Sequence, residues 1–233
     1  MLKSIHLGIP AFFSMACAST MPTAFGESTD VLSKNQASLS VMGGGGAVVG
    51  TCNGCSGSVS AVGGQARVRY GLGGNQEIGV SGYGAAIMSS ESGTSAIASG
   101  GAELSYKIAP APWFALVLGG GMIDLDGTCG GGGDVGVLFA THVTDTMSVY
   151  SGARGAFVGY PSGSGAFSES VTVPVGLSVG VADNVKLIAE GGLVVGWEQF
   201  NGDDSLSSDA IVGGYGTFAI QFMFGDKDEL AKK

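Results

Sequence analysis

Charged residues are scarce in this chain of 233 residues, where they make up 12% of the sequence against 45% hydrophobic residues. This balance excludes an intrinsically disordered protein, which is rich in charge and poor in hydrophobic residues. Proline occurs only 6 times and the 44 glycines follow no three-residue repeat, so a collagen helix is excluded as well. After the N-terminus, no stretch of 18 apolar residues is available for a transmembrane helix. The classes that remain are an apolar soluble β protein and a membrane β-barrel, in which lipid-facing and lumen-facing residues alternate.

The first 26 residues have the features of a secretory signal peptide. Lys3 precedes an apolar run at 7–15, and small residues permit cleavage after Ala18 or after Gly26. The sequence that ends at Cys17 also resembles a lipoprotein signal, in which this cysteine becomes the lipidated N-terminus. We therefore expect an exported protein, with a signal peptide over residues 1–26 and a short periplasmic segment over residues 27–36.

From residue 37 onward, hydrophobic residues recur with a period of two, which is typical of strands and not of helices. In the ninth segment below, Val185 and Leu193 share one face of the strand, whereas Glu190 lies on the other. The pattern predicts ten strands at residues 37–49, 57–70, 76–88, 95–108, 113–124, 134–143, 147–160, 168–182, 185–199 and 210–224. Each is long enough to cross a bilayer as a tilted strand, which takes about 9–11 residues.

The connections between these strands alternate between long and short along the chain. The short ones are residues 71–75, 109–112, 144–146 and 183–184, and the long ones are residues 50–56, 89–94, 125–133, 161–167 and 201–209. Outer-membrane barrels have tight turns on the periplasmic side and longer loops outside, whereas a soluble sandwich has no reason to sort its loops in this way. We therefore predict an all-β, antiparallel, up-and-down transmembrane barrel over 37–224, with both termini periplasmic and a charged tail at 225–233.

Aromatic residues cluster near the strand ends, as membrane interfaces favour. Trp113 and Phe224 lie near short turns, and Trp197 lies near a long connection. The closing segment at 215–224 alternates hydrophobic residues and ends in Phe224, and in these features the chain resembles small bacterial outer-membrane β-barrel proteins of eight to ten strands. The resemblance covers residues 37–224. It implies an integral outer-membrane location, with outer-membrane lipid and other envelope proteins as partners.

All five basic residues of the predicted strands, together with four glutamates, can be placed on the inward face. They are Arg67, Arg69, Glu77, Glu103, Lys107, Arg154, Lys186, Glu190 and Glu198. A charge that faces lipid at mid-membrane costs about 2–4 kcal/mol, which explains why the outer face lacks them. We expect the five basic and four acidic side chains to pair in a narrow lumen that side chains largely fill. Glycines on the inner face leave a narrow channel as the alternative.

The long connections are acidic and contain no lysine or arginine. The aspartates in or beside them are Asp124, Asp126, Asp134, Asp203, Asp204 and Asp209. Such loops keep a surface soluble, or attract cationic ligands and basic partners. The run that begins at Asp124 lacks the later ligands of a calcium loop, so no metal or other cofactor is expected. The absence of a basic patch excludes nucleic acid as a partner.

Three cysteines fall in the expected outer connections, where an oxidising exterior favours disulfides. Cys52 and Cys55 are close enough in sequence to pair with each other, which would leave Cys129 free. A bridge from either of them to Cys129 is the alternative. Zinc and haem are not expected, because a fourth ligand and a following histidine are missing.

Histidine is nearly absent, which bears on catalysis. Only His142 follows the signal region, and Asp145 is its near neighbour in sequence. A barrel enzyme needs a histidine beside a carboxylate or serine at the rim, so we expect no catalytic site. The first hypothesis is a non-catalytic surface barrel whose loops serve adhesion or scaffold an envelope assembly. The alternatives are a narrow ion or small-solute channel, similar to a porin, and an enzyme at the rim.

Overall fold

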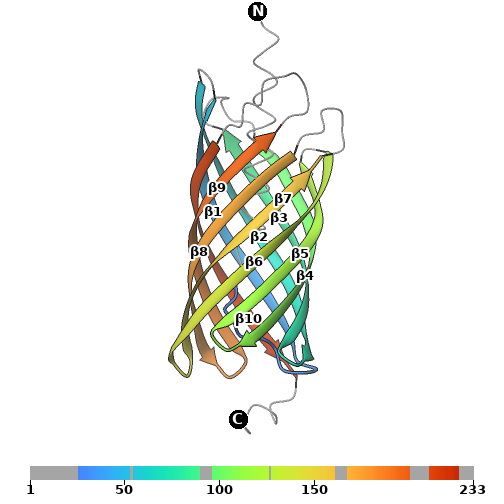
Figure 1. The fold of residues 1–233 in the computed structure, drawn as a ribbon, viewed down its shortest axis with the longest axis vertical. Helices are drawn as coiled ribbons and strands as arrows, with labels where there is room; N and C mark the ends of the chain where they lie inside the picture. The colour runs from blue at the N-terminus through green and yellow to red at the C-terminus, as the bar shows by residue number, and fades with distance from the viewer. Residues whose placement is uncertain are drawn as a thin grey trace, which may run out of the picture.

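The computed structural model describes residues 26–52, 55–89, 96–125, 127–160, 167–199 and 210–225. These residues form one closed antiparallel barrel (Figure 1). Its strands are β1 (Ala37–Cys52), β2 (Cys55–Gly73), β3 (Gln76–Ser89), β4 (Ala96–Ala111), β5 (Phe114–Leu125), β6 (Thr128–Thr144), β7 (Met147–Gly159), β8 (Phe167–Ala182), β9 (Val185–Gln199) and β10 (Ala210–Phe224). The predicted all-β, up-and-down barrel of ten strands is therefore confirmed.

Each strand pairs with its sequence neighbours, and β10 returns to pair with β1. This closing ladder runs from Ala37 opposite Phe224 to Gly50 opposite Ile211, so it leaves no open sheet edge. Closure matters because an unpaired edge cannot lie in a membrane, where water is absent to satisfy its backbone groups. No helix in the described part of the chain is long and apolar enough to cross a membrane.

Side chains alternate between the lumen and the outer surface along every strand, as the period of two predicts. The outward residues are apolar and exposed: Leu104, Met122 and Leu193 are 62%, 66% and 65% exposed. Their inward neighbours on the same strands include Glu103 and Glu190, which are buried. An apolar exterior around a polar interior is the arrangement of a barrel that faces lipid.

Aromatic side chains mark both ends of this apolar exterior. Near the short turns, Trp113 stacks on Phe139 with ring centroids 6.4 Å apart. Near the opposite end, Phe157 stacks on Phe167 at 6.2 Å. These pairs lie where the two bands of interfacial aromatics are expected in an outer-membrane barrel.

The turns at the end where β1 begins and β10 ends are tight, as predicted. The turn between β2 and β3 is the clearest example, because Gly73, Gly74 and Asn75 all adopt positive φ angles. Glycine and asparagine tolerate this left-handed conformation better than other residues do.

Two of the predicted long connections are wrong. Strand β5 continues to Leu125 and β6 begins at Thr128, so most of the segment 125–133 lies in strands. The reason is local: Gly130–Gly133 carry no side chains and therefore show no alternation in the sequence. At the other site, β1 reaches Cys52 and β2 begins at Cys55, so residues 50–56 are also mainly strand.

Glycines meet glycines across much of the barrel wall. Some opposed pairs face the outer surface, such as Gly43 and Gly64, whereas Gly44 and Gly63, and Gly121 and Gly132, face the lumen. Where such residues face inward, the wall contributes no side chain to the lumen. At the levels of the two inward pairs, these strands contribute no side chain that would fill the lumen.

Candidate functional site in the barrel lumen

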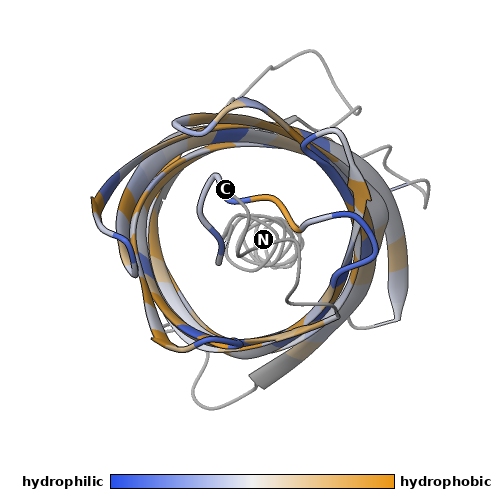
Figure 2. Cartoon of the chain, turned by 90° about the horizontal axis from the view of Figure 1, so that it is seen from below, coloured by the Kyte–Doolittle hydropathy of each residue, from blue (hydrophilic) through white to orange (hydrophobic). Residues whose placement is uncertain are grey.

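Residues 26–36 precede the first strand and fold back inside the barrel. Figure 2, viewed from the end with the short turns, shows this part of the chain within the ring of strands. The segment joins β1 at the rim, where the Asn35 N–H donates to the Gly71 carbonyl at 3.0 Å and the Gly71 N–H donates to Gln36 at 2.9 Å. We expected residues 27–36 to be a periplasmic segment separate from the barrel, whereas the structure places them inside it.

Gly71 is the point where this segment passes closest to the wall. A Cβ atom at this position would lie 2.1 Å from the Ser33 carbonyl oxygen and 2.6 Å from that of Leu32. Only glycine therefore lets the backbone of the segment approach β2 this closely.

Glu27 is the main anchor of the segment within the lumen. Its Oε1 accepts a hydrogen bond from Arg67 Nη1 at 3.1 Å, and its Oε2 accepts from Arg69 Nη1 and from Lys107 Nζ, the latter at 3.2 Å. The four side chains are only 3–7% exposed. Glu77 faces the same cluster, 2.8 Å from Arg69 and 3.5 Å from Lys107. Five charged groups therefore meet in a buried site, as hydrogen-bonded ion pairs.

The charge state of Glu27 follows from this environment. Burial raises the pKa of its carboxyl group, but Lys107, Arg69 and Arg67 lower it more, to about 2. The anchor is therefore an ionised carboxylate over the whole physiological pH range.

Asp30 fixes the segment to the opposite side of the lumen. Its Oδ2 accepts from Lys186 Nζ on β9 at 2.9 Å, and its Oδ1 lies 3.2 Å from His142 Nε2 on β6. Burial raises the pKa of Asp30, but Lys186, the Ser28 hydroxyl and Lys107 together lower it well below its ordinary value. The backbone contributes too, because Lys107 donates to the carbonyls of Ser28 and Asp30 at 2.8 and 2.7 Å.

Glu190 binds Gly26, the first described residue of the segment. Its carboxylate accepts hydrogen bonds from Tyr150 and Tyr215, both at 2.8 Å, and from the Gly26 N–H at 2.9 Å. The three side chains come from β7, β9 and β10, on a wall that the Glu27 cluster does not use. Sequence reasoning identified Glu190 but missed the two tyrosines, although both fall on inward positions of their strands.

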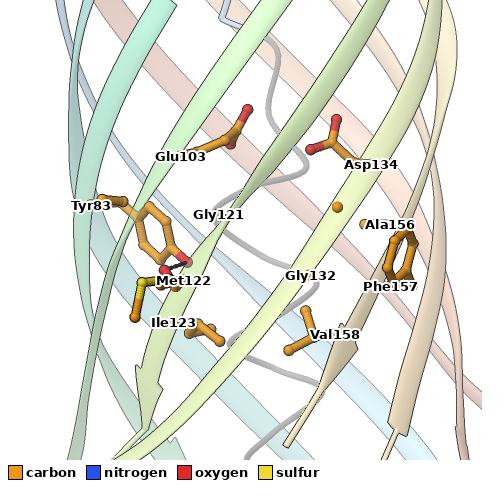
Figure 3. Close-up of a pocket in the computed structure, with 12 residues that line it drawn as sticks. Tyr83, Glu103, Gly121, Met122, Ile123, Gly132, Asp134, Ala156, Phe157 and Val158 are labelled. Carbon is orange, nitrogen blue, oxygen red and sulfur yellow. Dashed lines mark hydrogen bonds between the residues drawn. The ribbon is translucent and has the colours of Figure 1, made fainter.

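A third cluster centres on Arg154 of β7. Its Nη2 donates to Glu103 at 3.0 Å, and its Nε donates to Asp134 at 2.8 Å, with Arg154 only 1% exposed. Figure 3 shows Glu103 and Asp134 on either side of the glycine-lined wall near Gly121. Asp134 was expected in an acidic outer loop, which is wrong, because β6 begins six residues before it and turns it inward.

The outer half of the lumen is apolar. Inward residues near the far strand ends form one buried cluster, made up of Val48, Val59, Ala61, Ile87, Ile123, Leu125, Val158, Tyr160 and Ile211. The charged groups thus lie between this cluster and the short-turn end. There, a cavity of about 630 Å³ opens between residues 27–36 and the wall of β6 to β10.

Several predicted site residues lie at the edge of the described part or beyond it. Cys52 and Cys55 are directly opposed in the β1–β2 ladder, but their side chains are not among those described. Cys129 is free and exposed, so it forms no bridge to either of them. Asp124 is exposed at the end of β5 and accepts a hydrogen bond from the Gly127 N–H. The side chain of Glu198, and residues 1–25, Asp126, Asp203, Asp204 and Asp209, lie outside the described residues.

Within the described residues, no group of three or more His, Cys, Asp or Glu side chains is arranged to hold a metal ion. His142 is 47% exposed and contacts Asp30, not the neighbouring Asp145. In the described part of the chain, the side chain that His142 contacts is the carboxylate of Asp30, not a serine or a cysteine that it could activate. The strongest feature of the lumen is therefore the set of bonds that hold residues 26–36 in place.

Comparisons with known proteins support the fold but do not assign the chain to a family. No family model and no curated protein matches the chain. Among solved structures, an outer membrane channel from Pseudomonas putida F1 is 12% identical, with a TM-score of 0.50, over 84% of this chain and 98% of the other. The outer membrane protease OmpT from Escherichia coli is 13% identical, with a TM-score of 0.43, over 84% and 100% of the two chains. Neisserial surface protein A is 14% identical, with a TM-score of 0.34, over 80% and 97%.

The closed barrel, its apolar exterior and the likeness to the Pseudomonas channel define the class of this protein. It has the fold and the apolar exterior of an integral outer-membrane β-barrel. More particularly, it is a ten-stranded barrel that carries its own N-terminal segment inside the lumen, bound by ion pairs to the wall.

Proposed function

We propose that this protein is a non-catalytic, gated channel of the outer membrane, closed at rest by residues 26–36. The observation that carries the proposal is the anchoring of Glu27 by three wall cations inside the lumen. With an even number of strands, β1 begins and β10 ends on the same side, which in this class of barrel is periplasmic, so residues 26–36 enter the barrel from that side.

The wall does not depend on the segment for its closure. Every strand from β1 to β10 is hydrogen-bonded on both sides to another strand. The segment passes closest to the wall at Gly71, and it is held through side chains and a few backbone bonds. Release of Glu27 and Asp30 would therefore open the inner half of the lumen without breaking the barrel.

Single-channel recording in planar bilayers tests the proposal. The wild-type protein is expected to give few current steps, and the double variant E27Q/D30N is expected to give frequent, discrete ones. The matched control is E169Q, because Glu169 is an exposed carboxylate on β8. Heat-dependent gel mobility shows that each variant is folded. Equal currents from the wild type and E27Q/D30N would contradict the proposed gate.

Adhesion or scaffolding by the outer loops stays a separate prediction. Most of the acidic residues on which it depends, including Asp203, Asp204 and Asp209, lie outside the described residues. Its test is the loss of partner binding when the charge of these loops is reversed.

A further inference from the structure

We propose that Arg67, Arg69 and Lys107 form a binding site for a small soluble oxyanion, a carboxylate or a phosphate. In the closed state, Glu27 occupies this site as a tethered ligand. The inference deepens the proposed gating and rests on the release of residues 26–36 from the lumen.

The geometry of the cluster is that of an oxyanion clamp. Arg67 and Arg69 lie two residues apart on β2, so both side chains face the lumen, and each binds a different oxygen of the Glu27 carboxylate. Lys107 reaches the second oxygen from β4, at 3.2 Å. Guanidinium groups with a planar fork of donors, joined by an ammonium group, are the usual partners of carboxylates and phosphates in proteins.

The charge balance of the wall favours an added anion. Arg69 and Lys107 also contact Glu77 from the neighbouring strand, so loss of Glu27 removes one of the two carboxylates that these cations share. All of these side chains are nearly buried, at 2–5% exposure for Glu77, Lys107 and Arg69. Buried charges that lose a partner are strongly destabilising, and a bound anion removes this penalty.

Lys107 gains free donors when the segment leaves. It now donates to the carbonyl oxygens of Ser28 and Asp30 as well as to Glu27. All three of these acceptors belong to the segment. An ammonium group that loses them at once can offer its hydrogens to the oxygens of an incoming phosphate.

Thermal unfolding of the full chain in maltoside micelles, with inorganic phosphate as the probe, tests the site. The variant E27Q is expected to gain about 2–4 °C in Tm when phosphate exceeds its dissociation constant about fivefold. The wild type and D30N are expected to gain much less, because Glu27 still fills the site. Removal of a clamp residue in E27Q/K107Q is expected to abolish the gain, which separates binding from a general salt effect.

Gly71→Ala provides a second route to the open site. Its Cβ would displace Ser33 and the rest of the segment while Glu27 stays intact, so a phosphate-dependent gain in Tm is expected here too. Phosphatidylglycerol added to the micelles distinguishes a lipid headgroup from a free anion, and is expected to have no effect. An equal phosphate response in E27Q and E27Q/K107Q, or a response to the lipid alone, would overturn the oxyanion site.

The two proposals can fail separately. Phosphate binding by E27Q together with an electrically silent E27Q/D30N would support the oxyanion site and refute the gate. Current steps from E27Q/D30N without phosphate binding by E27Q would support the gate and refute the oxyanion site.

Discussion

Arg154 is the cation whose loss would leave the most charge buried without a partner. It is 1% exposed and binds both Glu103 and Asp134. We predict that Arg154→Met lowers the free energy of unfolding by about 3–5 kcal/mol, because two carboxylates remain in the lumen without their shared cation. Urea unfolding in micelles measures the change.

Lys186 supplies the matched control for this prediction. It also pairs with an aspartate, but the side chains of Lys186 and Asp30 are 26% and 37% exposed. Water screens such a pair, so Lys186→Met is expected to cost about 0–1 kcal/mol. Equal losses from the two variants would show that burial does not decide the strength of these ion pairs.

Glu27 makes the binding of residues 26–36 in the lumen depend on pH within a defined range. Its pKa falls from an ordinary value near 4.5 to about 2 when it is bound. Because Glu27 has a lower pKa when it is bound, its ionised carboxylate stabilises the bound state fully above pH 4.5. This stabilisation is lost as the pH falls through about 2. We predict that wild-type currents stay rare from pH 7 to pH 5 and become frequent only as the pH approaches 2.

The same recordings with E27Q provide the control, because glutamine does not titrate. We expect the pH dependence between 4.5 and 2 to be weaker in this variant than in the wild type. Opening of the wild type between pH 7 and pH 5 would show that another group controls closure.

The residues of the lumen clusters were only partly predictable. Strand parity identified Arg67, Arg69 and Lys107 as inward cations, but not that Glu27 would join them. A signal was present, since the predicted lumen held more basic than acidic side chains and acidic residues precede the first strand. Sequence periodicity contains no information about the path of a segment that is not a strand.

At the scale of single elements, the alternation of hydrophobic residues predicted each strand. The alternation did not predict the start of β6, because consecutive glycines there give no hydrophobic pattern that would distinguish one face of the strand from the other. For this reason Asp134 was expected in an outer loop, whereas in the structure it forms an ion pair with Arg154 in the lumen.

Glycines in neighbouring strands are not equivalent, and this gives a prediction at the element scale. A Cβ at Gly132 on β6 would lie 2.0 Å from the Phe157 carbonyl oxygen, whereas a Cβ at Gly155 on β7 would meet nothing within 4 Å. We predict that Gly132→Ala destabilises the barrel by about 1–3 kcal/mol through overpacking.

Gly155→Ala is the control, and we expect it to stabilise the barrel by about 0.4–1 kcal/mol because alanine restricts the unfolded chain. Both changes are read from the midpoint of urea unfolding in the same micelles. A similar shift in both variants would mean that close packing of the β6 wall is not required for stability.

At the scale of the whole molecule, the barrel combines an apolar exterior with three charged clusters and an apolar outer lumen. Two of these clusters bind the segment, one through Glu190 on β9 and the other through Arg69 on β2 and Lys107 on β4. Residues 26–36, bound to several strands inside the lumen, distinguish this protein from a barrel that consists of its strands alone.

The most direct test of residues 26–36 as the occupant of the lumen is the reactivity of a cysteine placed within them. Thr29 is 1% exposed, whereas the native Cys129 is exposed and serves as an internal positive control. We predict that a charged methanethiosulfonate reagent labels Cys129 of Thr29→Cys rapidly and leaves position 29 unlabelled, as read by peptide mass spectrometry. Addition of E27Q and D30N should make position 29 reactive. Equal labelling of positions 29 and 129 without those changes would contradict the placement of the segment inside the barrel.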